Sequence, residues 1–153
     1  MNKSELLQAV LREVREERLR LSTALEESRS AATDPDSKAE SKYDTRSLEV
    51  SYLAAGQAKQ LKDLEQSVRI LESLEPRSFE GYEPIELGAL VELEVEEAVW
   101  KKYYLLPAGG GVTVAFDGHE VTTLAPGSPL CEKLIGLRIG DQVGEAMSVT
   151  EVS

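Results

Sequence analysis

Along the N-terminal part of the chain, apolar residues recur with the alternating three- and four-residue spacing of a heptad repeat. They are Leu7, Leu11, Val14, Leu21 and Leu25, with Arg18 interrupting the series at one d position. The positions between them are mostly charged, which is typical of the solvent-exposed face of a helix. The pattern predicts one long amphipathic helix, which Ser4 can cap although no strict capping box follows it.

The heptad pattern stops at residues 31–37, where Pro35 would clash with a continuing helix and Asp and Ser side chains favour a turn. A second series with the same spacing ends near Pro76 and comprises Val50, Ala54, Gln57, Leu61, Leu64, Val68 and Leu71. Two apolar stripes joined by a polar turn bury each other best as an antiparallel hairpin. We therefore expect a coiled-coil hairpin over residues 1–76, with its tip at about 32–47 and helices of roughly 40 Å.

A coiled coil between two copies of the chain would show the same periodicity. Small and polar seam residues, here Ala54 and Gln57, weaken a long oligomeric zipper but are tolerated in a rod of two helices. A monomer is therefore the expectation, and the mass measured by sedimentation separates it from the oligomeric alternative.

After Pro76 the apolar period changes from the heptad to strict alternation. The apolar residues of this segment are Leu87, Ala89, Val91, Leu93 and Val95. They alternate against Glu86, Glu92, Glu94 and Glu96, which predicts a half-buried strand with an acidic outer face. Further strands are expected at 103–106, 112–116 and 121–124, with a last pair around Val143, Val149 and Val152. The glycine-rich segment 107–111 between two of them is a turn, since it lacks the lysine of a phosphate-binding loop.

Residues 128–136 carry the start and stop signals of a short helix, with Ser128 at the N-cap, Pro129 at the first position and Gly136 at the end. The predicted fold class is α+β. Residues 1–76 form the helical hairpin, and residues 77–153 form a small antiparallel β domain with one short helix.

The composition describes a soluble protein, because 41% of the 153 residues are hydrophobic and 29% are charged. No stretch approaches the roughly 20 apolar residues of a membrane-spanning helix. The N-terminus also lacks the apolar core and cleavage site of a signal peptide. We expect a cytoplasmic protein with no membrane partner.

The net charge of −11 argues against direct binding to nucleic acid, which needs clustered Lys and Arg. Residues 1–76 hold 12 basic and 15 acidic residues, whereas residues 77–153 hold 5 and 13, so the acidity is concentrated in the second half. A protein or a metal ion is a better-suited partner. Cys131 is the only cysteine and His119 the only histidine, and a buried structural thiol is a more common role for such a cysteine than catalysis.

The segment from Ala125 to Asp141 resembles the C-terminal signature of the GreA and GreB transcription elongation factors. The shared features are Ser-Pro-Leu, Leu-Ile-Gly and the closing Gly-Asp at matching spacings. The resemblance implies an FK506-binding-protein-like C-terminal domain that docks on the rim of the bacterial RNA polymerase secondary channel, while the hairpin enters the channel. Ser128 and Pro129 match the docking loop of the family, and Gly127 stands where better-known members carry Asn or Asp.

The resemblance also implies a role for acidic residues at the hairpin tip. In Gre factors these help to hold the second magnesium ion of the polymerase, so that the polymerase cleaves backtracked RNA. One or two carboxylates can complete a site for Mg²⁺, which prefers hard oxygen ligands. Here Asp44 matches the aspartate of the family's Asp-x-x-Glu pair and is the metal candidate, but Ser47 occupies the glutamate position. Other acidic candidates near the tip are Asp36, Glu40 and Glu49.

The chain is accordingly expected to be an accessory factor without catalytic residues of its own or a stably bound cofactor, sharing Mg²⁺ with the polymerase. One alternative is a channel-binding competitor or inhibitor without cleavage stimulation, as in the Rnk group. An FK506-binding-protein-like peptide-binding or prolyl isomerase domain, carried on an oligomerising coiled coil, is another. The eight aromatic residues of the chain are few for an aromatic-lined isomerase pocket.

Overall fold

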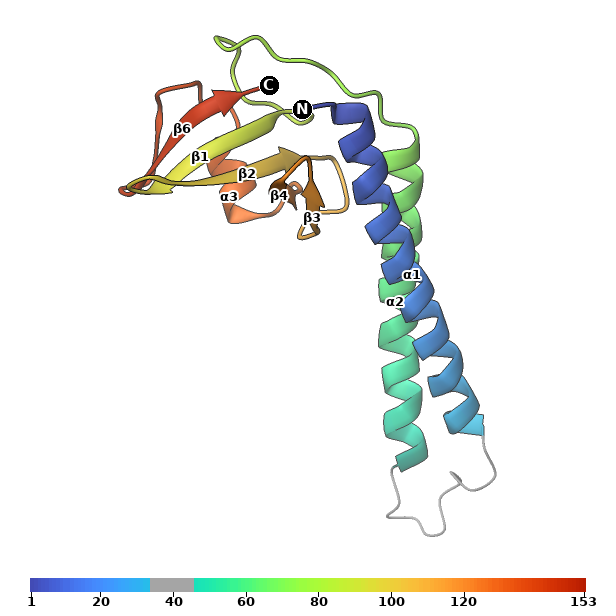
Figure 1. The fold of residues 1–153 in the computed structure, drawn as a ribbon. Coiled ribbons are helices and arrows are strands. Elements are labelled where there is room, and N and C mark those ends of the chain that lie inside the picture. The colour runs from blue at the N-terminus through green and yellow to red at the C-terminus, as the bar shows by residue number, and fades with distance from the viewer. Residues whose placement is uncertain (34–45) are drawn as a thin grey trace. The chain divides into compact units, whose positions relative to one another are not determined.

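The computed structural model describes residues 1–33 and 46–153, and its fold class is α+β (Figure 1). Contacts divide the chain into two compact units, Arg15–Gln66 and Met1–Val14 with Ser67–Ser153. The predicted division at residues 76 and 77 remains a prediction. The elements are α1 (Lys3–Thr33), α2 (Arg46–Glu72), β1 (Leu90–Glu96), β2 (Val99–Leu105), β3 (Thr113–Phe116), β4 (His119–Leu124), α3 (Pro129–Leu134), β5 (Gln142–Val143) and β6 (Met147–Val152).

Within the unit Arg15–Gln66, α1 and α2 form the predicted antiparallel hairpin. The Ser28 hydroxyl donates a hydrogen bond of 2.7 Å to Oε1 of Gln57. Nearer the other end of this unit, Leu19 and Leu61 line one shallow groove between the helices. The bond explains how a polar residue occupies the seam, because Gln57 finds a partner on the facing helix.

In the other unit, the first turns of α1 are buried on more sides than the heptad predicts. Leu7, Leu11 and Val14 are buried as expected, but Leu6 and Val10 are also completely buried. A polar residue begins the helix, since Oδ1 of Asn2 accepts hydrogen bonds from the backbone N–H groups of residues 4 and 5. Asn2, and not the predicted Ser4, therefore caps α1.

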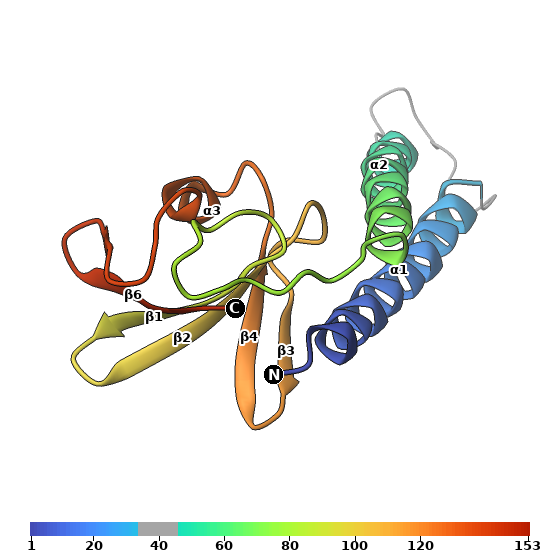
Figure 2. The same cartoon turned by 90° about the horizontal axis from the view of Figure 1, so that it is seen from above.

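The sheet has the strand order β3-β4-β2-β1-β6-β5. Its pairs are antiparallel except for β2 and β4, which run parallel from Lys102↔Val121 to Leu105↔Leu124. The predicted purely antiparallel sheet is therefore wrong at this pair. The physical reason is the connection after β2. It leads to β3, which lies two places away from β2 in the sheet, and β4 then fills the place between them. Because β4 runs antiparallel to β3, it runs parallel to β2. Figure 2 shows the β3–β4 hairpin diverging from the β1–β2 hairpin.

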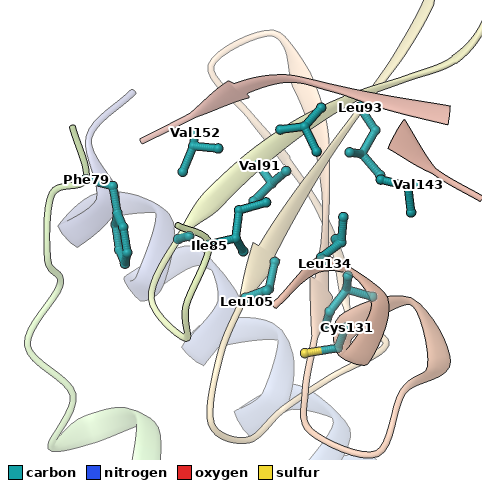
Figure 3. Packing of buried hydrophobic residues seen from close by; sticks show 12 residues of the cluster. Phe79, Ile85, Val91, Leu93, Leu105, Cys131, Leu134, Val143 and Val152 are labelled. Atoms are coloured by element: carbon teal, nitrogen blue, oxygen red, sulfur yellow. The ribbon is translucent and has the colours of Figure 1, made fainter. Parts of the chain in front are cut away.

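The turn between β3 and β4 has the sequence Asp117-Gly118, and both residues have positive φ (53° and 78°). Two such residues are required by the type I′ turns that match the twist of a β-hairpin. The main core lies between one face of the sheet and α3. Figure 3 shows Cys131 and Leu134 of α3 among side chains from the strands, including Val91, Leu93 and Leu105.

Two buried hydroxyls on neighbouring strands, on Thr123 and Tyr104, predict opposite mutational effects. The Thr123 hydroxyl donates to the Gly109 carbonyl at 2.5 Å and accepts from the Val112 N–H at 3.0 Å. The Tyr104 hydroxyl is buried and has no hydrogen-bond partner in the described part of the chain. Removal of the Tyr104 hydroxyl should therefore cost little free energy of unfolding, whereas removal of the Thr123 hydroxyl leaves two backbone groups unpaired.

We expect Thr123→Val to lower the free energy of unfolding by about 1–3 kcal/mol, and Tyr104→Phe to leave it unchanged or raise it slightly. Urea unfolding of both variants measures this. Destabilisation of Tyr104→Phe by as much as Thr123→Val would contradict the unpaired state of the tyrosine hydroxyl.

Candidate functional site

The loop in front of α3 is a tight turn made by Ala125-Pro126-Gly127-Ser128. The Ser128 N–H donates to the Ala125 carbonyl at 3.1 Å, which closes a four-residue turn. Gly127 has a φ of 96°. Proline at the second position and a positive φ at the third are the features of a type II turn, where Gly and Asn are favoured. Gly127 therefore supplies the backbone conformation of the loop.

Ser128 and Pro129 lie at the start of α3, as predicted. Ser128 is the N-cap residue with extended backbone angles, Pro129 follows at the first helical turn, and Gly136 after the helix has a φ of 85°. The Ser128 side chain makes no capping hydrogen bond. Ser128 is half-buried and Pro129 is exposed. The hydroxyl is thus not used in the helix cap and is available for contact with another molecule.

The glycine-rich turn at residues 107–111 packs against this loop. A Cβ atom added to Gly110 would lie 2.8 Å from Cβ and 2.9 Å from the backbone nitrogen of Ala125, so the two backbones are in close contact. Thr123 fixes the same turn, through its side-chain bonds and through its carbonyl, which accepts from the Gly111 N–H at 2.8 Å. Gly110, Ala125, Pro126 and Ser128 line a shared shallow groove. The loop is therefore held on a rigid base, and it exposes Pro126, Gly127 and Pro129, with Ser128 half-buried between them.

Thiol chemistry is not supported by the position of Cys131. The side chain is 1% exposed and belongs to the main core. Burial raises the pKa of its thiol, and the carboxylate of Glu132 adds to the effect. His119, the alternative reactive group, is exposed at the start of β4. A buried neutral thiol is a poor nucleophile, so Cys131 has a structural role.

Three of the tip candidates, Asp36, Glu40 and Asp44, lie outside the described residues. Glu49 is exposed near the start of α2. In residues 1–33 and 46–153, no group of three or more His, Cys, Asp or Glu side chains can hold a metal ion. No helix in the same ranges is long and apolar enough to cross a bilayer.

A second polar centre surrounds Lys3. Its ammonium donates to the carbonyls of Arg77 at 2.6 Å and Gly88 at 2.7 Å, and it lies 4.7 Å from the centre of the Phe79 ring. The Arg77 guanidinium also lies over this ring, at 4.2 Å. Burial, and secondly the charge of Arg77, lower the pKa of Lys3 from 10.5 to about 8. These contacts fasten the start of α1 to the segments on both sides of Phe79.

This lowered pKa predicts a pH-dependent stability. Between about pH 8 and 10.5 the unfolded chain binds more protons than the folded chain, by at most one at this site, so the free energy of unfolding rises with pH in that window. The slope stays well below the limit of about 1.4 kcal/mol per pH unit, because Lys3 is only partly buried and its carbonyl acceptors favour the ammonium. We expect Lys3→Met to flatten the rise. Urea unfolding at several pH values between 7 and 10 tests this, and an equal rise in both proteins would contradict it.

The sequence did not single out Gly110 or Thr123 as supports of the loop at residues 125–128. Two threonines, Thr122 and Thr123, lie between the apolar strand residues Val121 and Leu124, and the sequence does not show which of the two hydroxyls is buried and bonded. No feature of the sequence singled out Gly110, because three adjacent glycines do not show which of them lies against another segment of the backbone.

No protein-family model and no curated protein matches the chain. Among solved structures, the chain is similar to Gfh1 of Thermus aquaticus, with 16% identity over 95% of this chain and 94% of that chain and a TM-score of 0.38. It is also similar to GreA factor homolog 1 (Gfh1) of Thermus thermophilus, with 22% identity, coverage of 97% and 93%, and a TM-score of 0.37. Identities and TM-scores this low do not place the chain in a family, so its function is argued from its own residues.

Proposed function

We propose that this chain is an accessory factor of RNA polymerase, which docks through the loop at Ser128 and Pro129 and inserts its helical hairpin into the secondary channel. The observation that carries the proposal is the Gre-like segment from Ala125 to Asp141, found behind a helical hairpin. Its serine, prolines and glycines form an exposed turn and the two ends of a short helix. The hydroxyl of Ser128, unused in the helix cap, supports a contact at this loop.

The helices support the second part of the proposal. α1 has 31 residues and α2 has 27. At about 1.5 Å per residue, these are roughly 46 and 40 Å long. Residues 15–33 and 46–66, which belong to the hairpin unit, account for roughly 28 and 32 Å of these lengths, and this is the reach available to enter a channel. Cleavage chemistry would belong to the polymerase, and this chain would contribute at most a carboxylate to its shared Mg²⁺.

A second candidate function within the same class is favoured by Ser47. Because a hydroxyl stands where the family's tip has a glutamate, the tip has one fewer carboxylate for the metal. We infer that the chain occupies the channel with little stimulation of transcript cleavage and so competes with other channel-binding factors.

Direct binding to purified core RNA polymerase tests the proposed function. Wild type is expected to bind at micromolar concentration or tighter. Pro129→Arg, at an exposed docking position, should weaken binding by about tenfold or more, since a mismatched charge at a contact costs 1 kcal/mol or more. Ser128→Ala removes a hydroxyl that makes no capping hydrogen bond. Its unfolding free energy should therefore stay within about 0.5 kcal/mol of wild type, so that any loss of binding reports on the contact itself. No binding of wild type at micromolar concentration would overturn the proposal.

A further inference from the structure

Two segments of the Met1–Val14 and Ser67–Ser153 unit run side by side at the C-terminal end of α3. The Ile85 N–H donates to the Leu137 carbonyl, and the Gly136 N–H donates to the Ile85 carbonyl, both at 2.8 Å. Farther along, the Arg138 guanidinium donates to the Tyr82 carbonyl. A Cβ atom on Gly81 would lie 3.4 Å from the end of the Ile139 side chain. Figure 2 shows the segment before β1 passing beside α3. Residues 81–85 and 135–139 therefore form one fixed surface.

This surface exposes three large apolar side chains. Tyr82 is 74% exposed, and Ile135 and Ile139 are each 43% exposed. We name these three residues the Tyr82 patch. Main-chain bonds between Ile85 and residues 136 and 137, and the bond from the Arg138 side chain to the Tyr82 carbonyl, hold the backbone that carries them, so little backbone order would be lost on binding. An exposed aromatic side chain with branched apolar residues on the adjacent segment is a common centre of a protein–protein contact.

The surroundings of the Tyr82 patch are acidic. Residues 80–87 and 132–141 contain five carboxylates (Glu80, Glu83, Glu86, Glu132 and Asp141) against two cations (Lys133 and Arg138). Arg77 offsets part of this charge through ion pairs with Glu83 at 2.8 Å and Glu86 at 3.1 Å. An apolar centre with an acidic rim complements a partner surface that has an apolar centre and a rim of Lys and Arg.

The patch is close to the docking loop. α3 has six residues and separates Ser128 from Ile135. A helix of that length spans about 9 Å, which is well within the width of a protein interface. We propose that the Tyr82 patch continues the docking surface beyond Ser128 and Pro129, and that it seats an apolar, basic-rimmed segment of the polymerase. This inference rests on the proposed function.

Charge insertion into the patch tests it. Ile135→Lys and Ile139→Lys place a cation against a basic rim, and both side chains are exposed enough to be replaced without disturbing the core. Val99→Lys is the matched control, since Val99 is 42% exposed in the β1–β2 hairpin and also changes from a branched apolar side chain to lysine. Tyr82→Ala removes the aromatic side chain without adding charge, and the carbonyl that accepts from Arg138 remains.

Binding of each variant to core RNA polymerase is measured together with its urea unfolding. We expect both isoleucine variants and Tyr82→Ala to weaken binding by about fivefold or more, as truncation of a central contact does. Val99→Lys should stay within twofold of wild type, and higher salt should weaken wild-type binding. Wild-type binding with all three patch variants within twofold of it would overturn the Tyr82 patch. Absent wild-type binding would instead overturn the proposed function.

Discussion

Ser47→Glu is expected to increase the rate of transcript cleavage in a backtracked RNA polymerase complex by about tenfold or more over wild type. It restores the Asp-x-x-Glu spacing with Asp44, and a second carboxylate gives Mg²⁺ another hard oxygen ligand. A tenfold gain corresponds to about 1.4 kcal/mol in the activation free energy, which is modest for one metal ligand. The measurement is the rate of RNA shortening in a stalled complex at saturating protein.

Asp44→Ala in the same background supplies the control for this gain. Because the proposed metal contact needs both carboxylates, the double variant should return to the wild-type rate. Equal rates of RNA shortening with the single and the double variant would mean that the added glutamate acts without Asp44. If the wild-type chain stimulated transcript cleavage by the polymerase as strongly as GreB does, the inference that Ser47 lowers the stimulating activity of the tip would be contradicted.

Gly110→Ala is expected to lower the free energy of unfolding by about 2–3 kcal/mol, as overpacking of a tight contact does. The new methyl group would lie 2.8 Å from Cβ and 2.9 Å from the backbone nitrogen of Ala125. One of these atoms belongs to the backbone, so relief requires one of the two loops to move. Ala125 begins the turn that carries Ser128, so binding to the polymerase should weaken as well.

Gly56→Ala is the matched control, because a Cβ atom at Gly56 would meet nothing within 4 Å. Gly56 lies inside α2, where alanine is favoured over glycine by about 1 kcal/mol. The same substitution should thus stabilise one unit and destabilise the other. An unfolding free energy of Gly110→Ala within about 0.5 kcal/mol of wild type would show that the loops are not in close contact.

Periodicity predicted most of the fold, because each predicted element buries one face. The heptad positions Leu7, Leu11 and Val14 and the strand residues Val91 and Leu93 are buried as expected. Leu6 and Val10 were missed because the heptad describes a helix with one partner, and the first turns of α1 are covered on more sides. The parallel pairing of β2 with β4 was missed because strand patterns carry no information on strand order.

The start of α3 was predicted more completely than the tip. Serine, proline and glycine have specific backbone preferences at helix ends, so Ser128, Pro129 and Gly136 predicted where the helix starts and stops, although the turn at residues 125–128 before it was not predicted. Metal binding at the tip depends on how side chains such as Asp44 are placed in space, and spacing along the chain does not determine that. The cleavage role therefore depends on the resemblance alone.

If the chain occupies the secondary channel of RNA polymerase, as we propose, it must compete with GreB for core polymerase. The measurement follows labelled chain bound to core polymerase as unlabelled GreB is added. We predict that GreB displaces the labelled chain from core polymerase completely. At GreB concentrations well above its own dissociation constant, the apparent dissociation constant of the chain should rise in proportion to the GreB concentration. Labelled chain that stays bound at saturating GreB would place its binding site elsewhere on the polymerase and contradict the account.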